Sequence, residues 1–462
     1  MAVEGTWRIE GADLDQDALA TVRGLVAGEE HVRVELSPDG RTLFGRARAE
    51  QPTLNRMLRL AERIHRHVGG TLEVADDLGV LGKPFPCPSQ GVDLTGTRRD
   101  RYASELAGRG LTELPDDALH GRPAHLDLSS NRFTHLPCLP DFVASVDLSN
   151  NRIEALPPGS LHGCPPKVDL SHNPCPHLPD DALASPTLLE LVARRMGLEA
   201  LPDVGGGALR HLDVSGNALV SLPASVSSLP LRHLDLFGNP LDELPAHLTR
   251  LKKLTWLSVA QTPLTDLPRL ALPRLTELRL DRARFAAVPN TVARLRRLQC
   301  LDLSRLPLVD LPGFLADLPD LRTLRLVHTT LEGLPDALRG MARLESLDLR
   351  GTPIDEVPEW LADLGWLQSL DLSHTRVRDL PEALERSPVQ RLDLGSLALT
   401  DVPEVVDVMP ELTHVDLSGN QLREVPLSVL HHPRLRVLDV RDNPLARPVE
   451  AWDCKAGLRI VA

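Results

Sequence analysis

The sequence predicts an α/β solenoid, in which short repeats stack side by side and contribute parallel strands to one concave sheet. A Leu-Pro or Val-Pro pair returns every 20 to 23 residues from Leu114-Pro115 to Val425-Pro426. Ten residues before each pair lies a couplet, which is two aliphatic residues separated by one position. A unit of this size cannot bury its own apolar face, so neighbouring units must stack. The result is an extended surface suited to binding.

Residues 1–78 carry no such repeat and predict a small α+β domain. Four segments have the apolar pattern of strands: 6–10, 31–36, 42–47 and 71–74. Two segments have helical spacing of apolar residues: 13–27 and 51–68. The order β-α-β-β-α-β resembles the ferredoxin-like arrangement, a fold that hosts many functions. It therefore predicts a fold and no activity.

Residues 79–110 are expected to form a proline-stiffened linker and an N-terminal cap, with a helix over 98–107. A degenerate first strand at 92–94 and a partial repeat at 106–115 are expected beside it, because terminal repeats are atypical. The solenoid is predicted over 111–448. Residues 449–462 are expected to shield its last strand, since an uncovered apolar edge invites aggregation.

Each position of the repeat has a predicted role. The aliphatic residues of a couplet point inward, and the residues before, between and after them point out of the concave sheet. An asparagine that follows the couplet is expected to satisfy backbone groups of the neighbouring turn. The asparagine sites are Asn131, Asn151, Asn173, Asn217, Asn239, Asn420 and Asn443. Threonine or an apolar residue replaces it in the middle of the array, where the repeats are expected to be less rigid.

The pattern L-x-x-L-x-L-x-x-N/T-x-L-x-x-L-P, seen at Leu212 to Pro223 and Val415 to Pro426, resembles the Ras-suppressor, Shoc2 and plant intracellular Ras-group class of leucine-rich repeats. The resemblance covers about three quarters of the chain. It implies a cytoplasmic scaffold that binds a signalling protein on its concave face. The shorter repeats are also similar to arrays of bacterial effectors, some of which carry a ubiquitin-ligase domain with a catalytic Cys-x-Asp. Here Cys454 stands in another order, between Asp453 and Lys455, so that activity is not implied.

Composition narrows the class of partner. The chain has 462 residues and a net charge of -13, which argues against general affinity for nucleic acid and favours a basic or mixed protein surface. The six cysteines have no paired spacing, so a reduced, cytoplasmic protein is expected. No signal-like start or long apolar run predicts secretion or a membrane span. Arginine outnumbers lysine about nine to one, which indicates a GC-rich, bacterial source.

Aspartate occupies the middle position of eleven of the fifteen couplets. These residues are Asp127, Asp147, Asp169, Asp213, Asp235, Asp302, Asp348, Asp371, Asp393, Asp416 and Asp439. Stacked at strand spacing, they predict an acidic stripe that steers a basic partner. The alternative is that aspartate is a well-tolerated, soluble filler of this repeat.

The stripe is interrupted in the middle of the array. Val192, Ser258, Arg279 and Arg325 replace aspartate there, and Arg194, Arg282, Arg305 and Arg350 follow nearby. The middle of the concave face is therefore expected to become positive. A charge boundary of this kind can set the register of a bound partner.

Two aromatic residues are the predicted anchors of the binding face. Only 3% of residues are aromatic, yet Phe237 and Trp256 fall at outward positions of adjacent repeats, near Val192 and Ala260. Interface anchors are often aromatic residues at the centre of a patch. The alternative is that Trp256 lies flat across its neighbours His233 and Glu277 and has no further role.

The pairs His211 with Asp213 and His233 with Asp235 stand in register on neighbouring strands. Their side chains suit a divalent ion such as zinc, but such stacks also arise from repetition alone. A pH-sensitive patch is favoured over a metal site, and no cofactor is expected.

No phosphate-binding glycine loop, Gly-x-Ser-x-Gly or His-Glu-x-x-His motif is found. We therefore expect a non-enzymatic interaction scaffold that binds a protein partner, with no nucleic acid and no membrane. A regulatory inhibitor, of the immunity type or directed at a GTPase, is the alternative, and an enzyme activity of the N-terminal domain is a weaker one. The expected contact residues are Val192, Arg194, Asp213, Asp235, Phe237, Trp256, Arg279, Arg282, Arg305 and Arg325.

Overall fold

The structure, a computed structural model, describes residues 3–10, 32–36, 42–49, 71–76, 103–115, 118–119 and 122–462. The chain divides into two compact units, residues 1–89 and 90–462.

The first unit contains an antiparallel sheet with the strand order β2-β3-β1-β4. Its strands are β1 (Val3–Glu10), β2 (Val32–Leu36), β3 (Thr42–Ala49) and β4 (Thr71–Asp76). They lie where the alternation of apolar residues predicts strands. The two predicted helical segments lie outside the described residues, so the complete ferredoxin-like arrangement stays a prediction.

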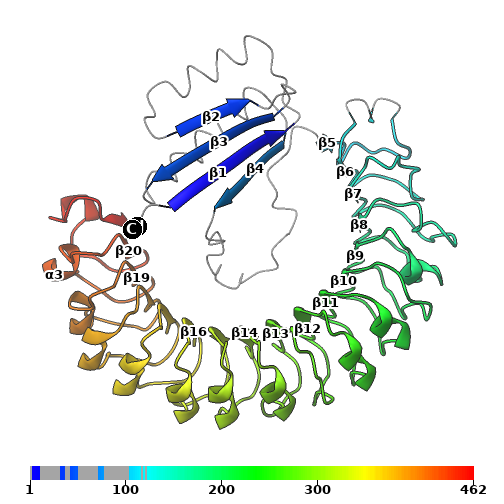
Figure 1. Ribbon diagram of the computed structural model, residues 1–462. Helices are drawn as coiled ribbons and strands as arrows, with labels where there is room; N and C mark the ends of the chain where they lie inside the picture. The colour runs from blue at the N-terminus through cyan, green and yellow to red at the C-terminus, as the bar shows by residue number, and fades with distance from the viewer. Residues whose placement is uncertain are drawn as a thin grey trace. The chain divides into compact units, whose positions relative to one another are not determined.

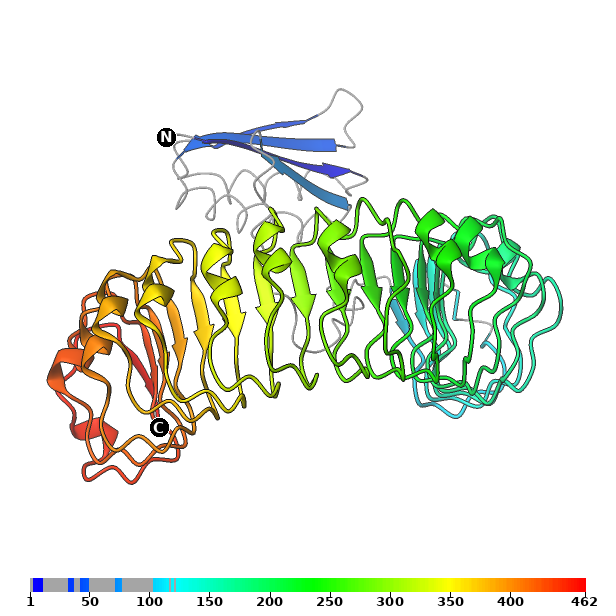
Figure 2. The ribbon, with the colours of Figure 1, turned by 90° about the horizontal axis from the view of Figure 1, so that it is seen from below.

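The second unit is built on one parallel sheet, in which every strand from β5 to β20 pairs with the next strand in sequence. The strands line the inner side of a curved array (Figure 1), and a second view shows them side by side in one row (Figure 2). Strands β6 to β20 are the fifteen predicted couplets. Their bounds are β5 (Ala103–Glu105), β6 (His125–Asp127), β7 (Ser145–Asp147), β8 (Lys167–Asp169), β9 (Glu190–Val192), β10 (His211–Asp213), β11 (His233–Asp235), β12 (Trp256–Ser258), β13 (Glu277–Arg279), β14 (Cys300–Asp302), β15 (Thr323–Arg325), β16 (Ser346–Asp348), β17 (Ser369–Asp371), β18 (Arg391–Asp393), β19 (His414–Asp416), β20 (Val437–Asp439) and β21 (Arg459–Val461).

Short helical turns form the convex side. They are the 3-10 helices η1 (Ala182–Ala184), η2 (Ala224–Ser228), η3 (Ala246–Arg250), η4 (Asn290–Arg294), η5 (Gly313–Asp317), η6 (Asp336–Gly340), η7 (Glu359–Asp363), η8 (Glu382–Arg386), η9 (Glu404–Asp407) and η10 (Val449–Ala451), and the α-helical turn α3 (Leu427–Leu430). From η2 onward, each turn follows a proline. The proline carbonyl accepts the first hydrogen bond of the turn, as from Leu248 to Pro245 at 3.1 Å. Proline suits this position because its missing N–H has no partner to lose.

The core lies between the sheet and these turns. Leucine side chains of the couplets are buried, with Leu212, Leu234 and Leu278 fully so. The asparagine sites join the repeats as predicted: Asn239 Nδ2 donates to the carbonyl of Val214 in the preceding repeat at 2.9 Å, and to that of Leu236 at 3.0 Å. Its Oδ1 accepts the N–H of Leu219 at 3.1 Å.

Where threonine replaces asparagine, a bond within the repeat is kept. Thr262 Oγ1 donates to the carbonyl of Val259 at 2.6 Å, and Thr352 Oγ1 donates to that of Leu349 at 2.6 Å. The threonine hydroxyl has one donor and a shorter reach than the asparagine amide. It therefore does not replace the bonds that the amide makes to the neighbouring repeat.

A second regularity was not predicted from the sequence. In every repeat from β6 to β20, the residue before the asparagine site has a positive φ, between 49° and 67°. Glycine, which tolerates this conformation, fills the position only at Gly216, Gly238, Gly351 and Gly419.

The ends of the sheet correct one prediction. The helix expected over 98–107 is wrong in its described part, because β5 (Ala103–Glu105) is a strand paired with β6, and residues 98–102 lie outside the described residues. The backbone of this segment is extended because it forms hydrogen bonds with β6. The N–H of Leu106, just after β5, donates to the carbonyl of Asp127 at 2.9 Å. The possible strand at 92–94 lies outside the described residues. At the other end, β21 covers β20, and Trp452 and Leu458 pack against the core.

Candidate binding face

The aspartates of the concave face have a structural function. In all eleven, Oδ1 accepts the backbone N–H of the residue two positions later, at 2.8 to 3.2 Å. Asp235, for example, accepts the N–H of Phe237 at 2.9 Å. Each carboxylate thus ends its strand and turns the chain toward the convex side. These aspartates are therefore more than soluble filler, because each one fixes the end of the strand in its own repeat.

The carboxylates differ in their charge environment. Asp213 is 1% exposed and forms an ion pair with Nε of Arg194 at 2.6 Å. Burial raises the pKa of Asp235 to about 7, and the neighbouring Asp213 adds to the effect. Burial and Asp371 raise the pKa of Asp393 to about 7 in the same way. The stripe is therefore not uniformly charged at neutral pH.

A row of stacked rings crosses the concave face at β10, β11 and β12. The rings of His211 and His233 stack with centroids 3.9 Å apart, and those of His233 and Trp256 stack at 3.8 Å. The guanidinium of Arg279 lies 5.2 Å from the Trp256 ring centroid, over the ring. Both faces of Trp256 are therefore covered by neighbouring repeats. The predicted anchor is stacked on His233, as the alternative interpretation held, and only part of its surface is open to a partner.

This environment changes the expected pH response. Burial lowers the pKa of His233 to about 2, and His211, Arg279 and Arg194 contribute. The pKa of His211 is also lowered, mainly by burial. Both imidazoles are thus neutral at physiological pH, so the pH sensitivity predicted for this patch does not come from its histidines. The groups that titrate near neutrality here are carboxylates, because buried acids hold their protons to higher pH.

Phe237 lies on the concave face just after β11. Its side chain is half-buried, and it is not part of the hydrophobic core. Val192, in β9, is also half-buried, whereas Ala260 is buried. Phe237 therefore offers apolar surface that the fold itself does not need.

The expected positive centre is only partly present. Arg279 pairs with Glu277 at 2.8 Å, and Arg325 lies 3.7 Å from Asp302. Their side chains are only 18% and 12% exposed. Acidic residues on the same or the adjacent strand neutralise these two arginines, so Arg279 and Arg325 add little to the predicted charge reversal. The positive charge that remains exposed is that of Arg282 and Arg305, which were predicted as part of this centre and form no ion pair with any described residue.

Two other classes of site are not seen in the part of the chain that the structure describes. It contains no group of three or more His, Cys, Asp or Glu side chains placed to hold a metal ion. Its helices are all too short or too polar to cross a membrane.

No protein-family model matches the sequence, and no curated protein matches it. Among solved structures, the chain is similar to a leucine-rich-repeat protein of Leptospira interrogans, at 24% identity and a TM-score of 0.54, over 74% of this chain and 90% of that one. It is also similar to mouse RP105, solved in complex with MD-1, at 19% identity and a TM-score of 0.53, over 75% of this chain and 70% of that one. YopM, a leucine-rich effector protein of Yersinia pestis, has 24% identity and a TM-score of 0.49, over 78% and 89% of the two chains.

The likeness to the Leptospira protein and the parallel sheet together show the fold. The described residues of the second unit form a leucine-rich-repeat solenoid.

Proposed function

We propose that the chain is a non-enzymatic scaffold that binds a protein partner on the concave face between β9 and β15. The observation that carries this proposal is Phe237, a half-buried aromatic residue outside the core, in the same repeat as His233, whose ring stacks with those of His211 and Trp256. Aromatic residues of this kind commonly anchor protein interfaces.

The rest of the face indicates the chemistry of the partner. The exposed guanidinium groups of Arg282 and Arg305 suit carboxylates, which they bind in a planar, bidentate manner. We expect the partner to place an apolar side chain against Phe237 and acidic side chains at these two arginines. The aspartates along the same face oppose a nucleic-acid backbone, whose phosphates would meet like charge.

A co-purification experiment tests this function. The full chain and a triple variant, Phe237→Ala with Arg282→Gln and Arg305→Gln, are used to capture proteins from the native cell, and the bound proteins are identified by mass spectrometry. Because these three side chains lie outside the core, the variant is expected to keep the wild-type melting temperature. A protein retained by the wild type and lost from the variant is the expected result.

Trp366→Ala is the matched control, because Trp366 is an aromatic residue that is 60% exposed and precedes Leu367 outside the concave face. Equal recovery of every protein by wild type and triple variant would remove the central face as the binding site. The inhibitor alternative uses the same face, and an activity assay of the captured partner, with and without this chain, separates inhibition from passive binding.

A further inference from the structure

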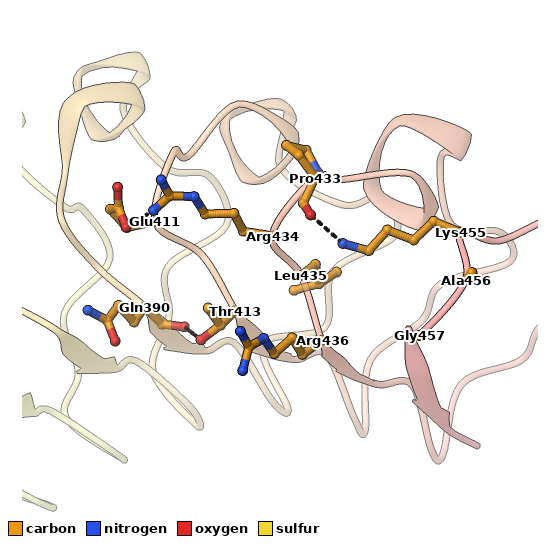
Figure 3. A pocket seen from close by; sticks show the side chains of 10 residues that line it. All are labelled: Gln390, Glu411, Thr413, Pro433, Arg434, Leu435, Arg436, Lys455, Ala456 and Gly457. Carbon is orange, nitrogen blue, oxygen red and sulfur yellow. Dashed lines mark hydrogen bonds and ion pairs between the residues drawn. The ribbon is translucent and has the colours of Figure 1, made fainter. Parts of the chain in front are cut away.

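A hollow of about 600 Å³ lies at the C-terminal end of the solenoid. Figure 3 shows the ten residues that line it. They are Gln390, Glu411, Thr413, Pro433, Arg434, Leu435, Arg436, Lys455, Ala456 and Gly457.

The hollow is on the edge of the solenoid and not on the concave face. Gln390, Thr413 and Arg436 each stand directly before a strand, at the starts of β18, β19 and β20. The backbone joins them in series: Thr413 donates to the carbonyl of Gln390 at 2.9 Å, and Arg436 to that of Thr413 at 2.8 Å. The lining thus belongs to the segments through which the chain returns from the convex turns to the sheet.

The lining is basic although the chain as a whole is acidic. It contains Arg434, Arg436 and Lys455 against one acid, Glu411, whereas the whole chain has a net charge of -13. Burial lowers the pKa of Lys455, and the positive charge of Arg436 contributes. Cations gathered in this way are stabilised when an anion joins them.

The hydrogen bonds show which donors are available. Arg434 is paired with Glu411, and Lys455 Nζ donates to the carbonyl of Pro433 at 2.8 Å (Figure 3). Arg436 is exposed, and its guanidinium forms no ion pair or hydrogen bond with any described residue. The guanidinium group of Arg436 and the remaining N–H donors of the Lys455 ammonium group can therefore bind a ligand.

We propose that this hollow binds an anionic side chain of a peptide segment, with the carboxylate or phosphate held by Arg436 and Lys455. A planar guanidinium binds two oxygens of such a group at once, and an ammonium adds a point charge. The lining comes from the returning segments of four successive repeats, which at about 4.8 Å per strand spans roughly 14 Å. That length holds about four residues of an extended peptide.

Two other ligand classes fit less well. A small-molecule site is usually apolar and aromatic, but no aromatic residue lines this hollow. A nucleic acid needs a long row of cations to replace its counterions, whereas only three are present here.

The experiment measures binding of fluorescein-labelled peptides to the full chain by fluorescence anisotropy. Three hexapeptides are compared: one rich in glutamate, one with phosphoserine at the same positions, and a neutral one with glutamine. We expect the wild type to bind an anionic peptide and not the glutamine peptide. The double variant Arg436→Gln with Lys455→Gln should bind about tenfold more weakly or worse, because two charge-assisted contacts are lost.

Arg232→Gln is the matched control, because Arg232 is an exposed arginine that stands directly before β11, at the same position of its repeat as Arg436. It should bind like the wild type. A variant of opposite effect is Glu411→Gln, which frees Arg434 and should tighten binding several-fold.

Each outcome decides the proposal. Preference for glutamate or for phosphoserine identifies the source of the anion, and either supports the site. Inorganic phosphate that competes with the phosphoserine peptide supports a phosphate-directed site. No binding by the wild type, equal binding of the glutamine peptide, equal loss in Arg232→Gln, or weaker binding by Glu411→Gln would each overturn it. Thermal unfolding of every variant establishes that it is folded.

This site does not rest on the concave-face proposal. The substitutions that test the two surfaces have no residue in common, so either proposal can fail while the other holds.

Discussion

At the scale of single residues, the aspartates of the concave face combine two functions. Each carboxylate accepts a backbone N–H at the end of its strand, and all but Asp302, which lies between Arg279 and Arg325, stand beside a carboxylate on a neighbouring strand. For Asp393, the neighbours are Asp371 and Asp416, and both raise its pKa. The hydrogen bond holds the group in place, while burial and like charge oppose its ionisation.

We expect Asp393→Asn to flatten the dependence of stability on pH. The pKa of Asp393 is about 7 in the folded chain and 3.8 ordinarily, so the folded state binds the extra proton. Its contribution is complete below about pH 4 and is lost as pH rises through 7. Between pH 5 and 8, wild-type stability should therefore fall by about 1–2 kcal/mol more than that of the variant, after allowance for solvent screening.

Urea unfolding at several pH values measures this difference. Asparagine keeps the Oδ1 acceptor for the N–H of Gly395, so the turn is preserved. Asp355→Asn, at an exposed aspartate outside the sheet, is the control and should follow the wild type. An unchanged slope in Asp393→Asn would contradict the pKa assignment.

A second residue-scale prediction concerns the asparagine ladder. Asn239 is 1% exposed and joins two repeats through Val214, Leu219 and Leu236. Asn239→Ala should lower the free energy of unfolding by about 2–4 kcal/mol, because buried backbone groups lose their partners. Asn239→Thr should lose less, since threonine keeps the bond within its own repeat, as Thr262 does.

Chemical denaturation of both variants provides the ranking. Thr262→Ala removes one hydrogen bond and should cost about 1 kcal/mol. A loss in Asn239→Thr as large as that in Asn239→Ala would mean that the bond within the repeat contributes nothing.

At the scale of the element, each repeat depends on a residue with positive φ between its strand and its convex turn. Gly238 and Gln261 hold this position in adjacent repeats, with φ of 66° and 53°. A side chain there meets its own backbone, and glycine avoids that contact. The conformation is nevertheless kept with arginine, histidine or serine, so the ladder of hydrogen bonds imposes it.

Exchanging the residue types at these two positions should have opposite effects. Gly238→Ala is expected to lower the free energy of unfolding by about 1 kcal/mol, because alanine must adopt a positive φ. Its Cβ would meet only the backbone of Gly216, with Cα at 3.6 Å and N at 3.7 Å, which is ordinary contact, so the conformation causes the loss. Gln261→Gly should be neutral or stabilising by up to about 1 kcal/mol.

Thermal and urea unfolding of the two single variants give the comparison. Val220→Gly, at an exposed position where no positive φ occurs, is the control and should destabilise modestly. A stabilising effect of Gly238→Ala would contradict the argument.

At the scale of the solenoid, stability depends on contacts between neighbouring repeats. Asparagine bridges join repeats near both ends, through Asn151 and Asn173 on one side and Asn420 and Asn443 on the other. From β12 to β18 the site holds threonine or an apolar residue, starting at Thr262 and ending at Leu397. The centre of the array therefore has fewer hydrogen bonds between repeats.

We expect amide hydrogen exchange to be faster in β12 to β18 than in β6 to β8, because local opening there breaks fewer bonds. Exchange of the full chain, followed by mass spectrometry of its peptides, makes the measurement. Uniform protection along the solenoid would show that packing of the leucine core alone sets the strength of the interfaces.

The repeat made much of the fold predictable. The spacing of couplets located β6 to β20, and proline after leucine located the convex turns, because these features are local and recur in every unit. The helix predicted over 98–107 failed in its described part because β5 (Ala103–Glu105) is extended by pairing with β6, a contact that local pattern does not record. The residue with positive φ before each asparagine site was also not predicted, because arginine and histidine at that position do not indicate a positive φ.

The sequence by itself determined the class of fold, the inward and outward positions and the residue types on the concave face, because a strand alternates with period two. Only the tertiary structure decided which of those residues remain available. It stacked Trp256 between His233 and Arg279, paired Arg325 with Asp302, and left Phe237 outside the core. It also gathered Arg436 and Lys455, which are 19 residues apart in sequence, into one hollow. Availability depends on side chains from neighbouring repeats meeting in space, and that is a property of the stack and not of any one repeat.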